Sequence, residues 1–373
     1  MNDMAQMTTN PSLGTFIFVL GGLAGAVFYL PLKKVKNWAW ETYWLFWAVF
    51  ALVVVPLILA FATAPNWLSV LKQSPSREIW YCFFCGAAWG FGGLTWGLMI
   101  RYLGVGLGLA IGCGLCSAAG TVVPPILKGQ FAQVCHTSSG HASLAAAVVS
   151  LVGIVLVGMA GMAKENELPE VEKKKAVAEY NFKKGILIAM FSGIMSAGMS
   201  FGLQGGPEIQ KLAAVVQPPT ALAWQGMPVL VVVLLGGFTV NFLWCLFLNA
   251  KNKTFGDYSK KGAPIPANII FGAIAGAIWT CQFIAFKTGE PKMGSLSYVG
   301  WAVLMASQIM FSGILGIILG EWRGTSSKTR GLLAGGLIVL LASAVIAGYS
   351  GKLGQEAAKP EVPTLQALPT QNP

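Results

Sequence analysis

Long apolar stretches alternate with short polar segments along the whole chain. Ten stretches of 19 to 29 residues contain no Lys, Arg, Asp or Glu, and they cover residues 13–32, 43–64, 79–100, 102–127, 141–163, 185–204, 220–248, 267–286, 296–320 and 331–349. About 20 apolar residues cross a bilayer core as a helix, and a backbone in lipid must satisfy its own hydrogen bonds. The pattern therefore predicts an all-α membrane protein with ten transmembrane helices.

Composition and charge agree with this class. Hydrophobic residues make up 55% of the chain and charged residues 10%, whereas a soluble domain carries about 25% charged residues. The net charge of +11 does not indicate a nucleic-acid partner, because the basic residues lie in short segments beside helix ends, where they set membrane orientation. The expected surroundings are membrane lipid, and no obligate protein partner is inferred.

The distribution of basic residues predicts the orientation. The segments after stretches one, three, five, seven and nine hold 17 Lys and Arg, and all other segments, termini included, hold 8. Because cytoplasmic segments carry the excess of positive charge, the odd-numbered loops are expected in the cytoplasm and both termini in the periplasm of a cell with an inner membrane.

The most charged segment divides the chain into two halves. Residues 164–184 are expected to form a cytoplasmic linker between five-helix repeats at 1–163 and 185–349, with a disordered tail at 350–373. Five spans per half give the halves opposite orientations, the arrangement of inverted repeats in transporters. Gly86-Ala87-x-x-Gly90 and Gly272-Ala273-x-x-Gly276 open the third and eighth stretches at equivalent places. Glycines at this spacing let membrane helices approach closely.

Polar side chains inside the apolar stretches are the main candidates for a binding site. The amides are Gln204, Asn241, Gln282 and Gln308, and the tryptophans well inside spans are Trp89, Trp96 and Trp279. Each amide alone is explained equally well as a hydrogen-bonding contact between helices. As a set they favour a polar cavity, and an indole beside amides suits a sugar, whose apolar face stacks on the ring. The expected binding residues are Trp89, Trp96, Gln204, Trp279, Gln282 and Gln308.

No carboxylate lies inside an apolar stretch, so the candidates for a proton carrier stand at the borders. Glu208 and Glu290 are expected to be solvated. Glu41 and Glu321 adjoin Trp residues, where partial burial favours the protonated carboxyl, and these two are the candidates for proton coupling.

Catalytic and metal chemistry find little support. Cys82-x-x-Cys85 and Cys113-x-x-Cys116 resemble two halves of a zinc site, but cysteine is also an ordinary small apolar residue, and that explanation is favoured. No enzyme site, metal or cofactor is expected.

Several segments resemble a known family. They are FYLPLKKVKNWAWETYW at 28–44, WGFGGLTWGLMIRYLGVGLG at 89–108, the end of span four at Thr121–Gly129, EYNFKKGILIAMFSGIMSAGMSFGL at 179–203, Trp279-x-x-Gln282-Phe283, and Glu321-Trp322. They are similar to segments of the bacterial L-rhamnose–proton symporters of the drug/metabolite transporter superfamily, and the resemblance runs from about residue 14 to residue 349. It implies a ten-helix fold in the inner membrane and uptake of L-rhamnose, or a related deoxysugar, with protons.

Other functions are also compatible with the pattern. A drug/metabolite-type exporter would have a cavity richer in aromatic side chains than in amides. A transporter of another small polar solute would use the same architecture. A membrane enzyme or a non-transporting scaffold is less compatible, because no acid–base cluster is visible and a scaffold does not need amides in four separate spans.

Overall fold

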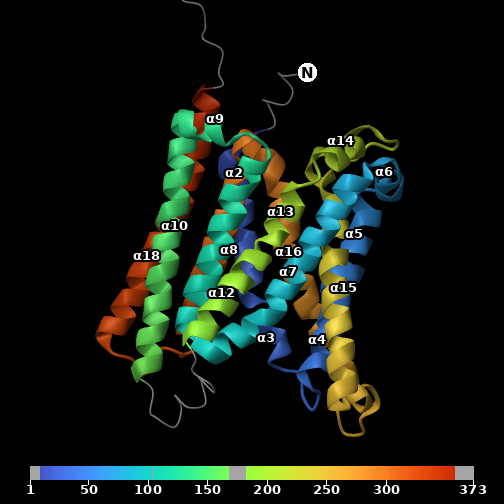
Figure 1. The fold of residues 1–373 in the computed structure, drawn as a ribbon, viewed down its shortest axis with the longest axis vertical. Helices are drawn as coiled ribbons and strands as arrows, with labels where there is room; N and C mark the ends of the chain where they lie inside the picture. The colour runs from blue at the N-terminus through green and yellow to red at the C-terminus, as the bar shows by residue number, and fades with distance from the viewer. Residues whose placement is uncertain (1–8, 104, 168–181, 358–373) are drawn as a thin grey trace, which may run out of the picture.

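The chain forms a bundle of helices (Figure 1). The computed structural model describes residues 9–103, 105–167 and 182–357, and these residues contain no strand. The longer helices are α2 (Pro11–Val27), α4 (Trp40–Val49), α5 (Val55–Thr63), α7 (Ser76–Leu103), α8 (Val105–Leu127), α10 (Ser138–Glu167), α12 (Phe182–Ser196), α14 (Pro207–Val215), α15 (Met227–Asn252), α16 (Ile265–Met293), α17 (Val299–Ile318) and α18 (Ser327–Ala357). The shorter helices are α3 (Tyr29–Leu32), α6 (Trp67–Gln73), α9 (Phe131–His136) and α13 (Gly198–Gln204), with a π-helical turn at Phe50–Val54 that joins α4 to α5.

Nine helical segments of the described chain are long and apolar enough to cross a membrane. They correspond to nine of the ten predicted stretches. The remaining stretch, 102–127, includes residue 104, which lies outside the described residues. It coincides with helix α8, whose segment Ile111–Leu127 forms a shorter apolar helix. The all-α membrane class is thus confirmed, with nine candidate spans.

The connecting segments gather at two ends of the bundle. At the upper end in Figure 1 lie α6, α9 and α14, where Asn10 donates its backbone N–H to the Lys292 carbonyl. At the lower end lie α3 and the start of α4, where Lys36 donates to the Asn268 side chain. We call the upper end the even-loop end and the lower end the odd-loop end, after the numbers of the spans that precede the loops there.

Close packing of the helices depends on glycine. A Cβ atom at Gly86 on α7 would overlap the Val233 carbonyl on α15, and one at Gly236 on α15 would overlap the Phe83 carbonyl on α7. On the other side of the bundle, Gly276 on α16 faces the backbone of Ala51 in the π-helical turn. Small residues at these points allow the backbones to approach, which is how membrane helices gain contact area.

Two expected boundaries fall close to helix ends. Helix α10 continues to Glu167 and α12 starts at Phe182, so most of the 164–184 linker lies outside the described residues. Helix α18 continues to Ala357, through the first eight residues assigned to the tail. Lys, Leu, Gln, Glu and Ala in this segment are good helix formers, and loss of apolar character ends a membrane span without ending a helix. Residues 358–373 lie outside the described residues.

Candidate functional site

A cavity of about 550 Å³ lies inside the bundle and is lined by helices from both halves of the chain. This volume is within the usual range for small-molecule sites. Five of the six expected binding residues line it, namely Trp89, Trp96, Trp279, Gln282 and Gln308. Because they come from α7, α16 and α17, the fold brings together residues up to about two hundred positions apart in the sequence.

Tryptophan is the most frequent residue in the cavity wall. The ring centroid of Trp279 lies 5.1 Å from that of Trp47 and 5.1 Å from that of Trp89. Phe283, one turn along α16, lies 4.7 Å from Trp279. These distances are typical of paired aromatic side chains, so the rings support one another and present a rigid apolar surface.

Two amides stand together on this wall, beside Gly25 of α2. A Cβ at Gly25 would lie 2.7 Å from Gln282 Oε1 and 2.9 Å from Gln308 Oε1, so only glycine leaves room for both amides. Gln308 donates its Nε2–H to the Gly25 carbonyl at 3.3 Å, and its Oε1 has no hydrogen-bond partner in the described structure.

The Gln282 side chain is a second polar group on the cavity wall. Gln282 is only 2% exposed, it lines the cavity, and no hydrogen bond joins its amide to any residue that the structure describes. A buried amide without a partner costs free energy. The Gln282 amide can therefore form hydrogen bonds with a polar group of a molecule bound in the cavity.

A hydroxyl group adds to the polar character of the wall on α12. Trp96 donates its Nε1–H to Ser196 Oγ at 2.9 Å, and both residues line the cavity. The bond fixes the plane of the Trp96 ring.

The other two expected intramembrane amides lie elsewhere. Gln204 is not among the cavity-lining residues. It is 3% exposed at the end of α13 and donates to Ser200 Oγ at 2.7 Å. Asn241 on α15 accepts from Trp44 Nε1 at 3.0 Å and donates to the Gly237 carbonyl at 2.9 Å. Asn241 thus acts as a contact between helices, the second of the two explanations open for each amide.

The two expected proton carriers occupy different environments. Glu321 lines the cavity and lies 3.8 Å from Lys33 Nζ, with both side chains about half exposed. Glu41 is 5% exposed and lies away from the cavity lining. Its Oε1 accepts from Asn252 at 3.0 Å and from Thr254 at 2.8 Å, which ties the start of α4 to the end of α15.

Several lining residues were not expected from the sequence. Trp44 was not among the expected binding residues, but it lines the cavity with Trp47, Trp301 and Ser196. The spacing of Trp44 and Trp47, three residues apart, places them on one helix face and would have been the usable signal. Cys113 and Cys116 also line the cavity, whereas Cys82 contacts the Gly202 carbonyl in α13. The two cysteine motifs therefore serve different surfaces.

The cavity extends to the odd-loop end of the bundle. Glu321 and Trp322, in the segment after α17, line it at the odd-loop end. Toward the even-loop end, beyond Ser196 and Phe283, a group of almost completely buried side chains fills the bundle. We call this group the apolar layer, and it consists of Phe18, Met199, Leu203, Met227, Phe286 and Trp301.

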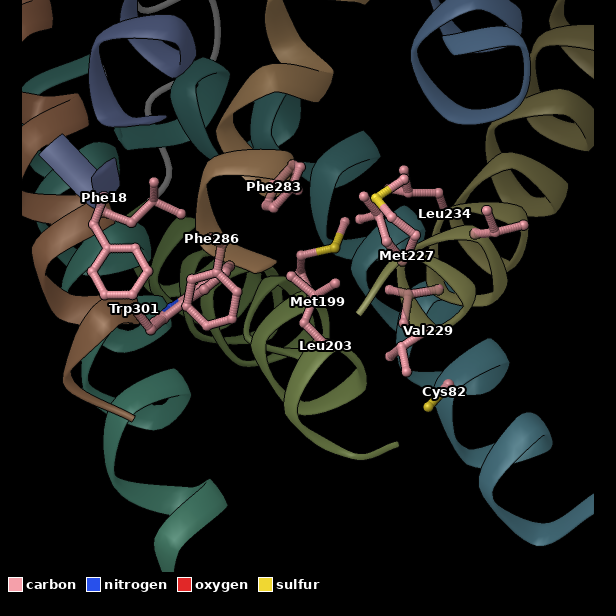
Figure 2. Close-up of a cluster of buried hydrophobic side chains, with 14 of the residues drawn as sticks. Phe18, Cys82, Met199, Leu203, Met227, Val229, Leu234, Phe283, Phe286 and Trp301 are labelled. Carbon is pink, nitrogen blue, oxygen red and sulfur yellow. The ribbon is translucent and has the colours of Figure 1, made fainter. Parts of the chain in front are cut away.

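Figure 2 shows the six side chains of the apolar layer among other buried hydrophobic residues, and they come from several helices. The Phe286 ring lies 5.6 Å from Phe18 and 5.9 Å from Trp301. Every member is at most 1% exposed, so these six side chains are packed against their neighbours and present almost no surface to water.

Comparison with known proteins places these features in a family. The family model for the L-rhamnose-proton symport protein matches residues 7–352. A protein of Klebsiella pneumoniae subsp. pneumoniae named L-rhamnose-proton symporter is 31% identical over 90% of this chain and 97% of its own length. Proteins of the same name from Salmonella typhi and Escherichia coli are 31% and 30% identical, each over 92% of this chain and 98% of their own length.

Proposed function

Because the chain belongs to the L-rhamnose-proton symport protein family, it is a multi-pass membrane transporter and not an enzyme, and we propose that it carries L-rhamnose inward across the inner membrane together with protons. The relatives that bear this name are about 30% identical, which supports the class of transporter. The sugar and its coupling to protons in this chain are the proposal.

The observation that carries the proposal is the unpartnered Gln282 amide beside an indole wall. A pyranose has hydroxyl groups that bond to amides and an apolar face that stacks on aromatic rings. L-Rhamnose also has a methyl group in place of a hydroxymethyl group, and the indole surface accommodates that methyl. We assign Gln282 and Gln308 to the hydroxyls, and Trp89, Trp96 and Trp279 to the ring and methyl.

Glu321 is the proposed proton carrier. It is the one carboxylate among the described cavity-lining residues. In the proposed cycle, Glu321 leaves its ion pair with Lys33 when the carboxylate takes up a proton. Glu41 is satisfied by two hydrogen bonds in a loop contact, and we assign it a structural role.

We infer that the chain has ten spans arranged as two inverted repeats, and helix packing supports this arrangement. In this arrangement each span of the first half is equivalent to the span five positions later. Two spans that pack together should then have equivalents that also pack together, and they do. Contact of α2 with α16 corresponds to contact of α12 with α7, and contact of α2 with α17 corresponds to contact of α12 with α8. The matched glycine motifs follow the same rule. Gly86 and Gly90 face α15 in span seven, and Gly272 and Gly276 face span two.

A second candidate function is export of a flatter, more apolar solute, as in other transporters of the superfamily. The specific observation in its favour is the wall itself, because tryptophan and phenylalanine outnumber amides among the lining residues. Such a solute would bind without using the Gln282 amide.

Uptake by purified protein in proteoliposomes tests the proposal. Labelled L-rhamnose should accumulate when the lumen is alkaline relative to the bath, and a protonophore should abolish accumulation. L-Mannose, which differs by one added hydroxyl, should compete poorly, because the apolar wall leaves that hydroxyl unpaired. Equilibration of rhamnose without a response to the gradient would contradict proton coupling, and no uptake in either condition would favour the exporter.

A further inference from the structure

A buried ion pair lies next to the apolar layer, at the even-loop end of the bundle. Lys287 and Glu290 on α16 form a salt bridge, and their side chains are 1% and 12% exposed. The sequence led us to expect Glu290 as a solvated group. The structure corrects this, because Glu290 is nearly buried and directly paired with Lys287.

The lysine also bonds to the backbone of a different span. Its Nζ donates to the Leu203 carbonyl at 2.9 Å, near the end of α13. The carbonyls at a helix C-terminus have no partner within the helix and carry partial negative charge. An ammonium group is therefore well placed there, and its bond holds the end of α13 against α16.

A third helix provides the space for this side chain. Gly226 immediately precedes α15, and a Cβ atom there would overlap the Cε of Lys287. The lysine stem thus fills a slot that exists only because residue 226 has no side chain. The ammonium and the stem of Lys287 thus join α16 to α13 and to the start of α15, and Glu290, on the same helix as Lys287, neutralises the buried ammonium.

Each attachment point is adjacent to the apolar layer. Leu203 belongs to the layer, Phe286 precedes Lys287, and Met227 follows Gly226. A buried pair contributes little net stability compared with apolar groups of the same size, and charged groups inside membrane proteins are usually functional. The contacts of Lys287 with Leu203 and Gly226 lie where α13, α15 and α16 meet beside the apolar layer.

We propose that the Lys287–Glu290 pair is the latch that keeps the even-loop end of the cavity closed, and that opening the cavity to that side requires Lys287 to leave the Leu203 carbonyl. The inference rests on the proposed transport function, since only a transporter needs access from both ends. The latch acts by positioning the three helices, and it does not touch the substrate.

The test measures access to the cavity and uses no sugar. In a full-length variant with all seven cysteines replaced by alanine, Ser312→Cys places one thiol at an exposed, cavity-lining position of α17. A membrane-impermeant thiol reagent is then applied to vesicles of each orientation. The parent should react quickly from the odd-loop side and slowly from the even-loop side.

Removal of the latch should increase labelling from the even-loop side at least tenfold. The variants are Lys287→Met and the double variant Lys287→Met with Glu290→Gln, which leaves no unpaired buried charge if the single variant fails to insert. Lys292→Met is the matched control, because Lys292 lies on the same helix and forms no ion pair with a described residue. It should react like the parent.

Labelling from the odd-loop side reports that each variant is folded. Unchanged even-loop labelling in the double variant, with odd-loop labelling intact, would overturn the latch. Failure of rhamnose uptake in the parent would instead count against the proposed function, so the two failures are distinguishable.

Discussion

Gln282 and Gln204 carry the same amide in different surroundings. Gln204 lies outside the cavity lining, where its Nε2 bonds to Ser200 one turn earlier and its buried Oε1 has no partner. The Gln282 amide also has no partner in the described structure, but it borders the cavity, where a ligand can reach it. A hydrogen bond between a ligand and the protein contributes most to binding when the protein group has no partner in the ligand-free state, because that group has then already lost its hydrogen bonds to water. Ligand binding is therefore expected to depend on Gln282.

Replacing Gln282 with Ala should weaken L-rhamnose binding by about 1–3 kcal/mol, roughly 5- to 150-fold in Kd, the cost of leaving a buried sugar hydroxyl unpaired. Equilibrium binding to purified protein measures this. Gln204→Ala is the matched control and should leave Kd unchanged. Equal affinity in Gln282→Ala and the parent would make Gln282 a packing residue.

Glu321→Gln should retain rhamnose binding and abolish the dependence of accumulation on the proton gradient, because an amide cannot carry the proton. Glu41→Gln should retain proton-driven accumulation, since Glu41 lies outside the cavity lining, and should lower thermal stability by weakening the contact with Asn252 and Thr254. Gradient-driven uptake and melting temperature in detergent measure the two effects. If Glu41→Gln abolished the dependence on the proton gradient and Glu321→Gln did not, Glu41 would be the proton carrier.

These residues show what could be predicted from the sequence. Hydropathy placed Trp89, Trp279 and Gln282 well inside their spans, because that position follows from the distance to the span ends, and the three residues line the cavity. It did not separate Gln282 from Gln204 and did not identify Trp44 as a lining residue, because that difference depends on which face of the helix points inward. A soluble helix reveals its inner face by amphipathicity, but lipid is as apolar as the protein interior, so the pattern is nearly uniform around each span.

At the scale of elements, glycine positions determine which helices can approach. Gly86, Gly90 and Gly237 sit at the contact between α7 and α15, and any larger residue there meets backbone or a ring. The sequence revealed the spacing of these glycines but not their partner helix, since contacts between distant spans leave no local signal.

Gly86→Ala should destabilise the protein by about 1–3 kcal/mol or more, because the added methyl overlaps the Val233 carbonyl and backbone cannot rotate away as a side chain can. Gly335→Ala, in the middle of α18 with nothing within 4 Å of the added methyl, should be neutral or stabilising by up to about 1 kcal/mol from helix propensity. Thermal unfolding of both variants in the same detergent provides the comparison. A stable Gly86→Ala protein would indicate that α7 and α15 are not in close contact.

At the scale of the whole molecule, the loops and the open cavity define two sides. The odd-loop end carries most of the basic residues and the mouth of the cavity beside Glu321. If basic residues face the cytoplasm, this conformation is open inward and closed outward by the apolar layer.

Reporter fusions test that orientation directly. A reporter fused at residue 173 should be active in the cytoplasm, and one fused after residue 357 should be active in the periplasm. Each position is fused to two reporters in turn, one enzyme that is active only in the periplasm and one that is active only in the cytoplasm. At either position only one of the two reporters should be active. A periplasmic signal at residue 173 would reverse the orientation.

The indole wall also has a spectroscopic consequence. Seven of the thirteen tryptophans line the cavity, and they are Trp44, Trp47, Trp89, Trp96, Trp279, Trp301 and Trp322. Indole emission shifts in wavelength and intensity with the polarity of its surroundings, so a sugar that displaces water from this wall changes more than half of the protein's emitters at once. Bound and empty transporters should differ in intrinsic fluorescence, and the chain thus contains its own optical sensor of occupancy.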